Sequence, residues 1–240
     1  MRYTRIFGAS STGAPWKGIA EATFAIIFTL LVIELPIMII EILDKGSSHA
    51  SYPELLMSIG ILVLGYFFIY AILYDVWAFH KGLLERGGGK KASEIITLFF
   101  IWMASLVPPA FYMLGHYSQK IILHEITGKK ELLLTNIEVT ICQVTMFAII
   151  GFLYLMLFLY AWNEQKETSG SQGEGNAITF KLIQSLTATR AILCLLVLLA
   201  SLCFAWPNYL IYLGFIALIT FTNFDLISST RTLSRALKGE

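Results

Sequence analysis

Five ionisable residues stand inside long apolar runs of the sequence, where charge is otherwise rare: Glu21, Asp75, His80, Arg190 and Asp225. A charge inside a bilayer costs about 2.5–3.5 kcal/mol or more, so such residues are usually paired and are suspected of function. At a rise of about 1.5 Å per residue, they share roughly the inner third of the membrane. The sequence therefore predicts one buried polar layer, in which Arg190 and Asp225 form an ion pair.

Two interpretations of this layer are open. Paired charges can simply join helices to one another inside the hydrocarbon. The layer can also serve as a proton relay or a gating element, because histidine is the side chain that changes charge near neutral pH. The single histidine of the layer, His80, does not decide between the two.

Long apolar segments must position these residues. The chain has 240 residues, of which 57% are hydrophobic and 14% are charged, against about 25% charged in an ordinary soluble domain. A helix of about 20 apolar residues crosses a hydrocarbon core about 30 Å thick and satisfies its own backbone there. Six such segments are predicted: 17–43, 52–84, 95–114, 136–162, 180–205 and 207–227. The expected fold is an all-α, six-helix transmembrane domain over residues 17–235.

The connections and basic residues predict an orientation. Residues 1–16 form a polar N-terminal segment, and residues 163–177 are expected to be a solvated cytoplasmic linker rich in Gly, Ser and Glu. With the N-terminus inside, 12 Lys and Arg residues fall on the cytoplasmic side and 4 outside, leaving Arg190 within a span. Because cytoplasmic loops carry the excess of Lys and Arg, both termini are predicted to be cytoplasmic. A kink is expected in the third segment at Pro108-Pro109.

Several classes of function have no support in the sequence. It contains no nucleophile-and-base motif, no phosphate-binding loop and no metal-ligand spacing, so we expect neither an enzyme nor a cofactor or metal site. The net charge is +1 and the chain lacks a basic patch with interleaved aromatic residues, so nucleic acid is not an expected partner. The cysteines lie in apolar runs and are predicted to be packing residues: Cys142, Cys194 and Cys203.

The first apolar segment carries a stripe along one helical face. Ile26, Thr29, Leu30 and Ile33 follow the i, i+3, i+4, i+7 pattern. Such a stripe is typical of a helix-packing face, and it also fits a hydrophobic pore constriction that gates by dewetting. Glu34 follows the stripe on the predicted outer side, either to attract cations or as an interfacial carboxylate without a task.

Short patterns in the first three segments occur in an informative order. They are FAIIFTLLVIELP at 24–36, WAFH at 77–80, SLVP at 105–108 and GHY at 115–117. These resemble, in order and rough spacing, four patterns of one family: the stretch after a Phe-Ser-Asp motif, Trp-x-x-His, Ser-Leu-x-Pro and Gly-x-Tyr. That family is the transmembrane protein 175 family of potassium-permeable channels of lysosomes and bacteria. The resemblance covers residues 19–117, and no single pattern is specific alone.

The resemblance implies how the chain works. It implies a homotetramer, in which each subunit is one six-helix repeat and the first helix lines the pore. It also implies that a bulky aliphatic side chain constricts the pore and that a nearby threonine contributes to selectivity. Position by position these are Ile26 and Thr29, with Leu30 and Ile33 as further pore-facing residues. The implied partners are potassium or other monovalent cations and the lipid bilayer, in a prokaryotic plasma membrane.

The chain departs from the family at the start of the first segment. Ile19-Ala20-Glu21 stands in place of Phe-Ser-Asp, and Pro15 replaces the arginine that precedes it. In the family these polar residues join the tryptophan and histidine of helix two in a network that holds the pore helix. We expect a rewired network in this chain, formed by Glu21, Asp75, Trp77, His80, Arg190 and Asp225.

The expected function is a cation channel, permeable above all to potassium. The departures leave two alternatives open. One is a non-conducting membrane scaffold or partner-binding protein that kept the fold. The other is a proton-linked transporter that uses the buried carboxylates, although transporters bind substrate at broken helices near the midplane and the first segment has an uninterrupted apolar centre.

Overall fold

The computed structural model describes residues 15–46, 51–86, 91–127, 132–168 and 174–203, and within these ranges only Ser51 and Leu106 lie outside a helix. The helices are α2 (Pro15–Gly46), α3 (Tyr52–Arg86), α4 (Lys91–Ser105), α5 (Val107–Thr127), α6 (Leu132–Thr168) and α7 (Glu174–Cys203). No strand occurs in the described part of the chain. The all-helical class expected from the sequence is therefore confirmed for these residues.

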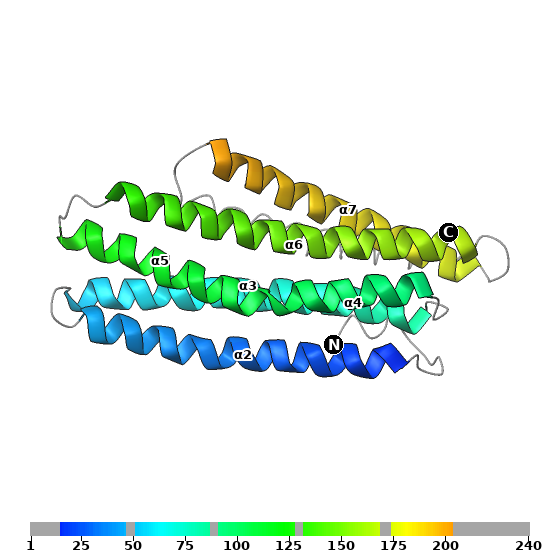
Figure 1. Cartoon of the computed structure of the whole chain (residues 1–240), viewed down its shortest axis with the longest axis horizontal. Coiled ribbons are helices and arrows are strands. Elements are labelled where there is room, and N and C mark those ends of the chain that lie inside the picture. The colour runs from blue at the N-terminus through cyan, green and yellow to red at the C-terminus, as the bar shows by residue number, and fades with distance from the viewer. Residues whose placement is uncertain (1–14, 47–50, 87–90, 128–131, 169–173, 204–240) are drawn as a thin grey trace, which may run out of the picture.

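The helices run up and down along one common axis, with α4 and α5 following one another as a single broken rod (Figure 1). Helix α2 packs on α3, α4 and α5, while α6 packs on α3, α4 and α5 from the other side. Helix α7 lies chiefly along α6, and the interface between these two helices is the largest in the bundle. The molecule thus has a first part, α2–α5, and a helical hairpin, α6–α7, laid against it.

Five stretches are long and apolar enough to cross a membrane: Gly18–Asp44, Leu55–Glu85, Glu94–Tyr117, Glu138–Lys166 and Thr179–Ala200. They coincide within a few residues with five of the predicted segments, because helix length in lipid is set by the thickness of the hydrocarbon core. Several such helices are consistent with a multi-pass membrane protein. The predicted sixth segment, 207–227, lies outside the described residues.

The predicted break in the third segment is present between α4 and α5. Helix α4 ends at Ser105, and Pro108 and Pro109 form the start of α5 with Val107. A proline has no N–H to donate, so the carbonyls four residues before the two prolines lose their helical partners. Locally, the N–H of Leu106 donates instead to the Met103 carbonyl at 3.1 Å, and Ser105 Oγ donates to the Trp102 carbonyl at 2.7 Å.

The segment predicted as a linker, 163–177, is largely helical in the described residues and lies mostly between two candidate spans. Helix α6 continues to Thr168 and α7 already begins at Glu174, so most of this segment is helical. The residues after Asn163 include Glu, Gln and Lys, which are good helix formers and can extend a helix into solvent. Lys166 Nζ lies 5.4 Å from the Trp162 ring, which adds a cation–π contact to this solvated turn.

The core of the first part is built on one face of α2. Phe24, Ile27, Leu31 and Met38 of this helix are each at most 1% exposed. Gly115 of α5 allows a close approach, because a Cβ added there would lie 2.6 Å from Met38 Sδ. The opposite face of α2 is left outside the packed core, so the helix presents two faces of very different character.

Candidate functional site

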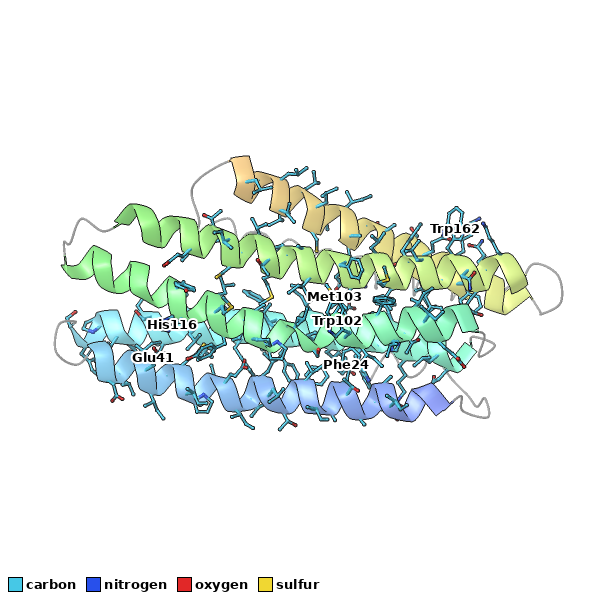
Figure 2. All side chains as sticks on the ribbon, viewed as in Figure 1. Phe24, Glu41, Trp102, Met103, His116 and Trp162 are labelled. Carbon is cyan, nitrogen blue, oxygen red and sulfur yellow. The ribbon has the colours of Figure 1, made fainter. Side chains whose placement is uncertain are left out.

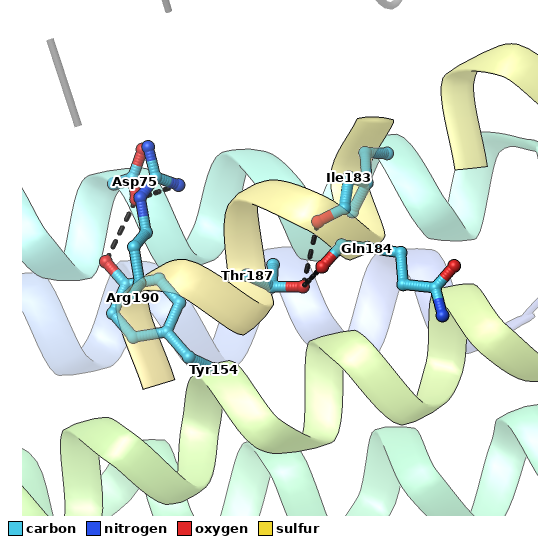
Figure 3. Close-up of polar contacts among 6 residues, drawn as sticks. All are labelled: Asp75, Tyr154, Ile183, Gln184, Thr187 and Arg190. Atoms are coloured by element: carbon cyan, nitrogen blue, oxygen red, sulfur yellow. Dashed lines mark hydrogen bonds and ion pairs between the residues drawn. The ribbon is translucent and has the colours of Figure 1, made fainter. Parts of the chain in front are cut away.

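An ion pair lies in the middle of the bundle, where Arg190 of α7 meets Asp75 of α3 (Figure 3). Arg190 Nη1 lies 2.8 Å from Asp75 Oδ2, and their side chains are 1% and 9% exposed. Tyr154 of α6 donates a hydrogen bond from its hydroxyl to the same carboxylate oxygen at 2.9 Å. We call these residues, Asp75, Tyr154 and Arg190, the α3–α7 cluster.

The cluster lies deep in the apolar segments. Asp75 precedes the end of its candidate span at Glu85, and Arg190 follows the start of its own at Thr179, each by about 15 Å along the helix. That depth is about half of a 30 Å hydrocarbon core. A lone charge would be costly at this depth, so the two opposite charges each depend on the other.

A close approach of α6 and α7 brings Tyr154 and Arg190 to one place. Gly151 stands one turn before Tyr154, and a Cβ added to it would lie 3.2 Å from the Cβ of Cys194, one turn after Arg190. Thr187 precedes Arg190 by one turn and is fully buried, and its hydroxyl donates back to the Ile183 carbonyl at 2.8 Å. The α7 face around Arg190 is therefore packed without unsatisfied hydroxyl groups of its own.

Aromatic rings cover the guanidinium group of Arg190. Its Cζ lies 4.5 Å from the ring centroid of Phe79 and 5.7 Å from that of Tyr154. The contact with Asp75 has the distance of an ion pair but not the alignment of a hydrogen bond, and no well-aligned acceptor for the guanidinium nitrogens occurs among the described residues. Charge neutralisation and ring contacts, rather than a bidentate fork, hold Arg190 in place.

The structure gives part of the polar layer expected from the sequence. Asp75, His80 and Arg190 are buried, at 6%, 1% and 1% exposure. Arg190 pairs with Asp75, while its predicted partner Asp225 lies outside the described residues. Tyr154 was missed because a tyrosine within an apolar run gives no signal of its own. Its spacing, near the same depth as Asp75, is the only sequence property that could have suggested it.

Glu21 was predicted to belong to the buried polar layer, but its side chain is not buried in the described structure. Its side chain is 42% exposed and it pairs with Lys81 of α3 at 3.1 Å, away from the buried cluster. Lys81 Nζ also lies 5.0 Å from the ring of Trp77, which is itself only half-buried. Glu21, Lys81 and Trp77 thus form a partly solvated group near the end of the span, because the long Lys side chain can extend toward water.

His80 is separated from both groups and is enclosed by aromatic rings. It stacks on Phe100 of α4 with centroids 4.2 Å apart, and lies 6.4 Å from Phe24 of α2 and 6.3 Å from Tyr160 of α6. Its Nε2 is buried without a hydrogen-bond partner among the described residues. Ala20 is buried and offers no polar group.

The predicted stripe of α2 lies on the face that the core leaves free. Ile26, Leu30 and Ile33 are 60%, 44% and 52% exposed, and Thr29 is exposed with them. Thr29 Oγ1 donates to the Ala25 carbonyl at 2.8 Å, so its oxygen can still accept a hydrogen bond or contact a cation. Within the described chain nothing covers this face.

Two carboxylates follow the stripe toward the other end of α2. Glu34 is half-buried, and one of its oxygens, Oε2, is buried without a hydrogen-bond partner among the described residues. Glu41 Oε1 lies 3.0 Å from His116 Nδ1 of α5, and the two side chains lie together in Figure 2. The rings of Tyr112 and Tyr117 flank His116 at 6.3 and 5.5 Å.

The contacts of the α3–α7 cluster are an ion pair, a hydrogen bond to the same carboxylate and ring contacts of the guanidinium. No group of three or more His, Cys, Asp or Glu side chains in the described ranges is placed to hold a metal ion. Cys142 and Cys194 are buried free thiols, in agreement with the packing role predicted for them, whereas the side chain of Cys203 is outside the description. Comparison of the chain with protein-family models, with curated proteins and with solved structures finds no match.

Proposed function

We propose that this protein is a subunit of a homo-oligomeric cation channel, permeable to potassium, whose pore is lined by α2. The observation that carries the proposal is the position of the stripe: Ile26, Thr29, Leu30 and Ile33 share the α2 face that the rest of the subunit leaves uncovered. The resemblance to the transmembrane protein 175 family names the same four residues. A tetramer would place four such faces around one axis.

The chemistry of this face suits a hydrophobic constriction. A ring of isoleucine side chains at position 26 would narrow the pore and hold water out until the helices move apart. The hydroxyl oxygen of Thr29 would be available to a partly dehydrated cation one turn further along. Glu34 follows beyond the stripe and would raise the local concentration of cations at the outer mouth.

The orientation with both termini in the cytoplasm belongs to this proposal, as does a prokaryotic plasma membrane. The helix ends alternate, so the start of α2, the junction of α3 with α4 and the junction of α6 with α7 meet at one end (Figure 1). Within the described helices, six Lys and Arg residues lie at that end and two, Lys45 and Lys120, at the other, which favours the cytoplasm for the first end. The six are Lys17, Lys81, Arg86, Lys91, Lys166 and Lys181. A reporter fused to either terminus would test this side directly.

A proton-linked transporter is the second candidate function. The observation that favours it is the α3–α7 cluster, because a carboxylate and an arginine buried in the membrane are frequent parts of proton pathways. A non-conducting scaffold would also retain such a cluster as a helix–helix contact. Neither alternative requires an uncovered, uncharged stripe on α2.

The test is potassium flux into proteoliposomes containing the wild type, Ile26→Asn or Ile141→Asn. Ile141 of α6 is 59% exposed against 60% for Ile26, so the control places the same polar group on an equally exposed apolar surface. We expect the wild type to conduct potassium selectively. Ile26→Asn should increase the flux or remove its potassium selectivity, and Ile141→Asn should leave both unchanged. No flux from any folded, oligomeric preparation, or equal effects of the two substitutions, would overturn the proposal.

A further inference from the structure

The two parts of the molecule meet mainly where α6 packs on α5 and α4, and the α3–α7 cluster lies in the smaller contact that α3 makes with the α6–α7 hairpin. Helix α7 touches α3 over a small area that includes the Arg190–Asp75 ion pair, while most of its surface contacts α6. Tyr154 adds α6 to the same carboxylate. One buried carboxylate of α3, that of Asp75, is therefore bound by both helices of the α6–α7 hairpin.

A chain of ring contacts continues from this cluster to α2. The guanidinium of Arg190 lies on Phe79, and the next residue, His80, stacks on Phe100 of α4. Phe24 of α2 lies 6.4 Å from His80 and 5.8 Å from Phe100, centroid to centroid. A displacement of α3 at Phe79 and His80 would thus act on Phe24.

Phe24 stands behind the exposed stripe. At 3.6 residues per turn, the four stripe residues lie about 140–240° around α2 from Phe24, which is the opposite side of the helix. Phe24 is 1% exposed and is the largest fully buried side chain of α2. The packing of its ring against the stacked pair of His80 and Phe100 therefore influences which residues the far side of α2 presents.

We propose that Arg190 is a positioning residue for α2: by holding Asp75 and Phe79 of α3, it fixes the rotation of α2 and hence the residues on its exposed face. The consequence for ion selectivity rests on the channel proposed above, whereas the consequence for helix position does not. A purely structural contact would add stability without a specific effect on α2.

The experiment measures a distance within the first part of the molecule. Nitroxide labels are placed on cysteines at Leu30 of α2 and Met113 of α5, which are 44% and 50% exposed, after Cys142, Cys194 and Cys203 are changed to alanine. Labelled subunits are diluted with unlabelled ones in liposomes, and the spin–spin distance is measured by pulsed electron resonance. Neither label stands on a helix of the α3–α7 cluster, so Arg190 can affect their distance only through other residues.

Arg190→Gln and Asp75→Asn are each expected to shift the distance between the labels by about 2 Å or more, the size of typical helix displacements. Lys181→Gln is the matched control, because it removes an exposed cation from the same helix. An unchanged distance in folded Arg190→Gln protein would overturn the proposal. If Arg190→Gln does not fold, Arg190→Lys is measured in its place, because lysine keeps the positive charge and loses the planar group that stacks on Phe79. A shifted label distance in Arg190→Lys supports the proposal, and an unshifted distance overturns it.

Potassium flux is recorded from the same Arg190 and Lys181 variants without the labels, so that Leu30 of the proposed pore face stays intact. If the wild type conducts, the potassium-to-sodium preference should change in Arg190→Gln and persist in Lys181→Gln. If the wild type carries no ion while the label distance shifts, the proposed channel fails and the positioning role of Arg190 stands.

Discussion

Helix α3 carries two ion pairs that differ sharply in their surroundings. Asp75 meets Arg190 with side chains 9% and 1% exposed, whereas Lys81 meets Glu21 with side chains 35% and 42% exposed. The first pair is far from water and each charge depends on its partner. The second can exchange its partner for solvent and ions at little cost. The two ion pairs have similar distances, 2.8 and 3.1 Å, and differ in burial. We therefore expect the buried pair to stabilise the bundle and the exposed pair to contribute little.

The largest effect is expected from Arg190→Met. It leaves the Asp75 carboxylate buried without a countercharge, and breaking a buried pair by removing one partner costs about 3–5 kcal/mol. Unfolding in denaturing detergent, followed by circular dichroism, would measure this loss. A free energy of unfolding equal to that of the wild type within error would show that the Arg190–Asp75 ion pair does not form in the folded protein.

Tyr154→Phe removes the hydroxyl that donates to Asp75 and keeps the ring. Hydrogen bonds to charged groups contribute about 1.5–3 kcal/mol, and we expect a loss in that range from the same unfolding measurement. Tyr70→Phe is the control, because that tyrosine is exposed and makes ring contacts that phenylalanine preserves. Equal losses in the two variants would contradict the role of the Tyr154 hydroxyl.

Gly151→Ala tests the close approach of α6 and α7 at the cluster. The added methyl group would lie 3.2 Å from the Cβ of Cys194, which no side-chain rotation can move away. Overpacking of this kind costs about 1–3 kcal/mol. Gly60→Ala is the control, because a Cβ there meets nothing within 4 Å and alanine favours the helix. A Gly151 variant as stable as the Gly60 variant would place the helices further apart than described.

The smallest effect is expected from Glu21→Gln. An exposed pair contributes about 0–1 kcal/mol, and salt screens it further. We expect a loss below about 1 kcal/mol at low salt that disappears at high salt, measured by unfolding at two salt concentrations. A loss as large as that of Arg190→Met would remove the contrast between the two pairs.

The fold was largely predictable, because lipid imposes strong rules on a chain. Five candidate membrane spans were placed within a few residues by the length needed to cross the hydrocarbon, and the break at Pro108-Pro109 followed from the missing N–H groups. The segment after Asn163 was assigned to a linker on its polarity. Its Glu, Gln and Lys residues are good helix formers, and α6 continues to Thr168 with Glu164 buried.

For the candidate site, the sequence predicted only how deep each residue lies along its membrane span. Counting residues along each span placed Asp75 and Arg190 in one layer, but pairing also requires the rotation of each helix and the helix it adjoins. One sequence fixes neither, so the Asp75–Arg190 pair was missed, and Glu21 was assigned to a layer that its exposure excludes. The face of α2 was easier to predict, since periodicity along one helix determines which residues share a side.

The most direct test of the central claim is the reversal potential of purified protein in a planar bilayer, with potassium chloride on one side and sodium chloride on the other. A potassium-selective channel lined by α2 predicts single-channel currents whose reversal potential lies far from zero, in the direction set by a high potassium-to-sodium permeability ratio. Ile26→Asn is expected to move this reversal potential toward zero. A silent bilayer containing folded oligomer, or currents whose reversal potential Ile26→Asn leaves unchanged, would contradict the proposed pore.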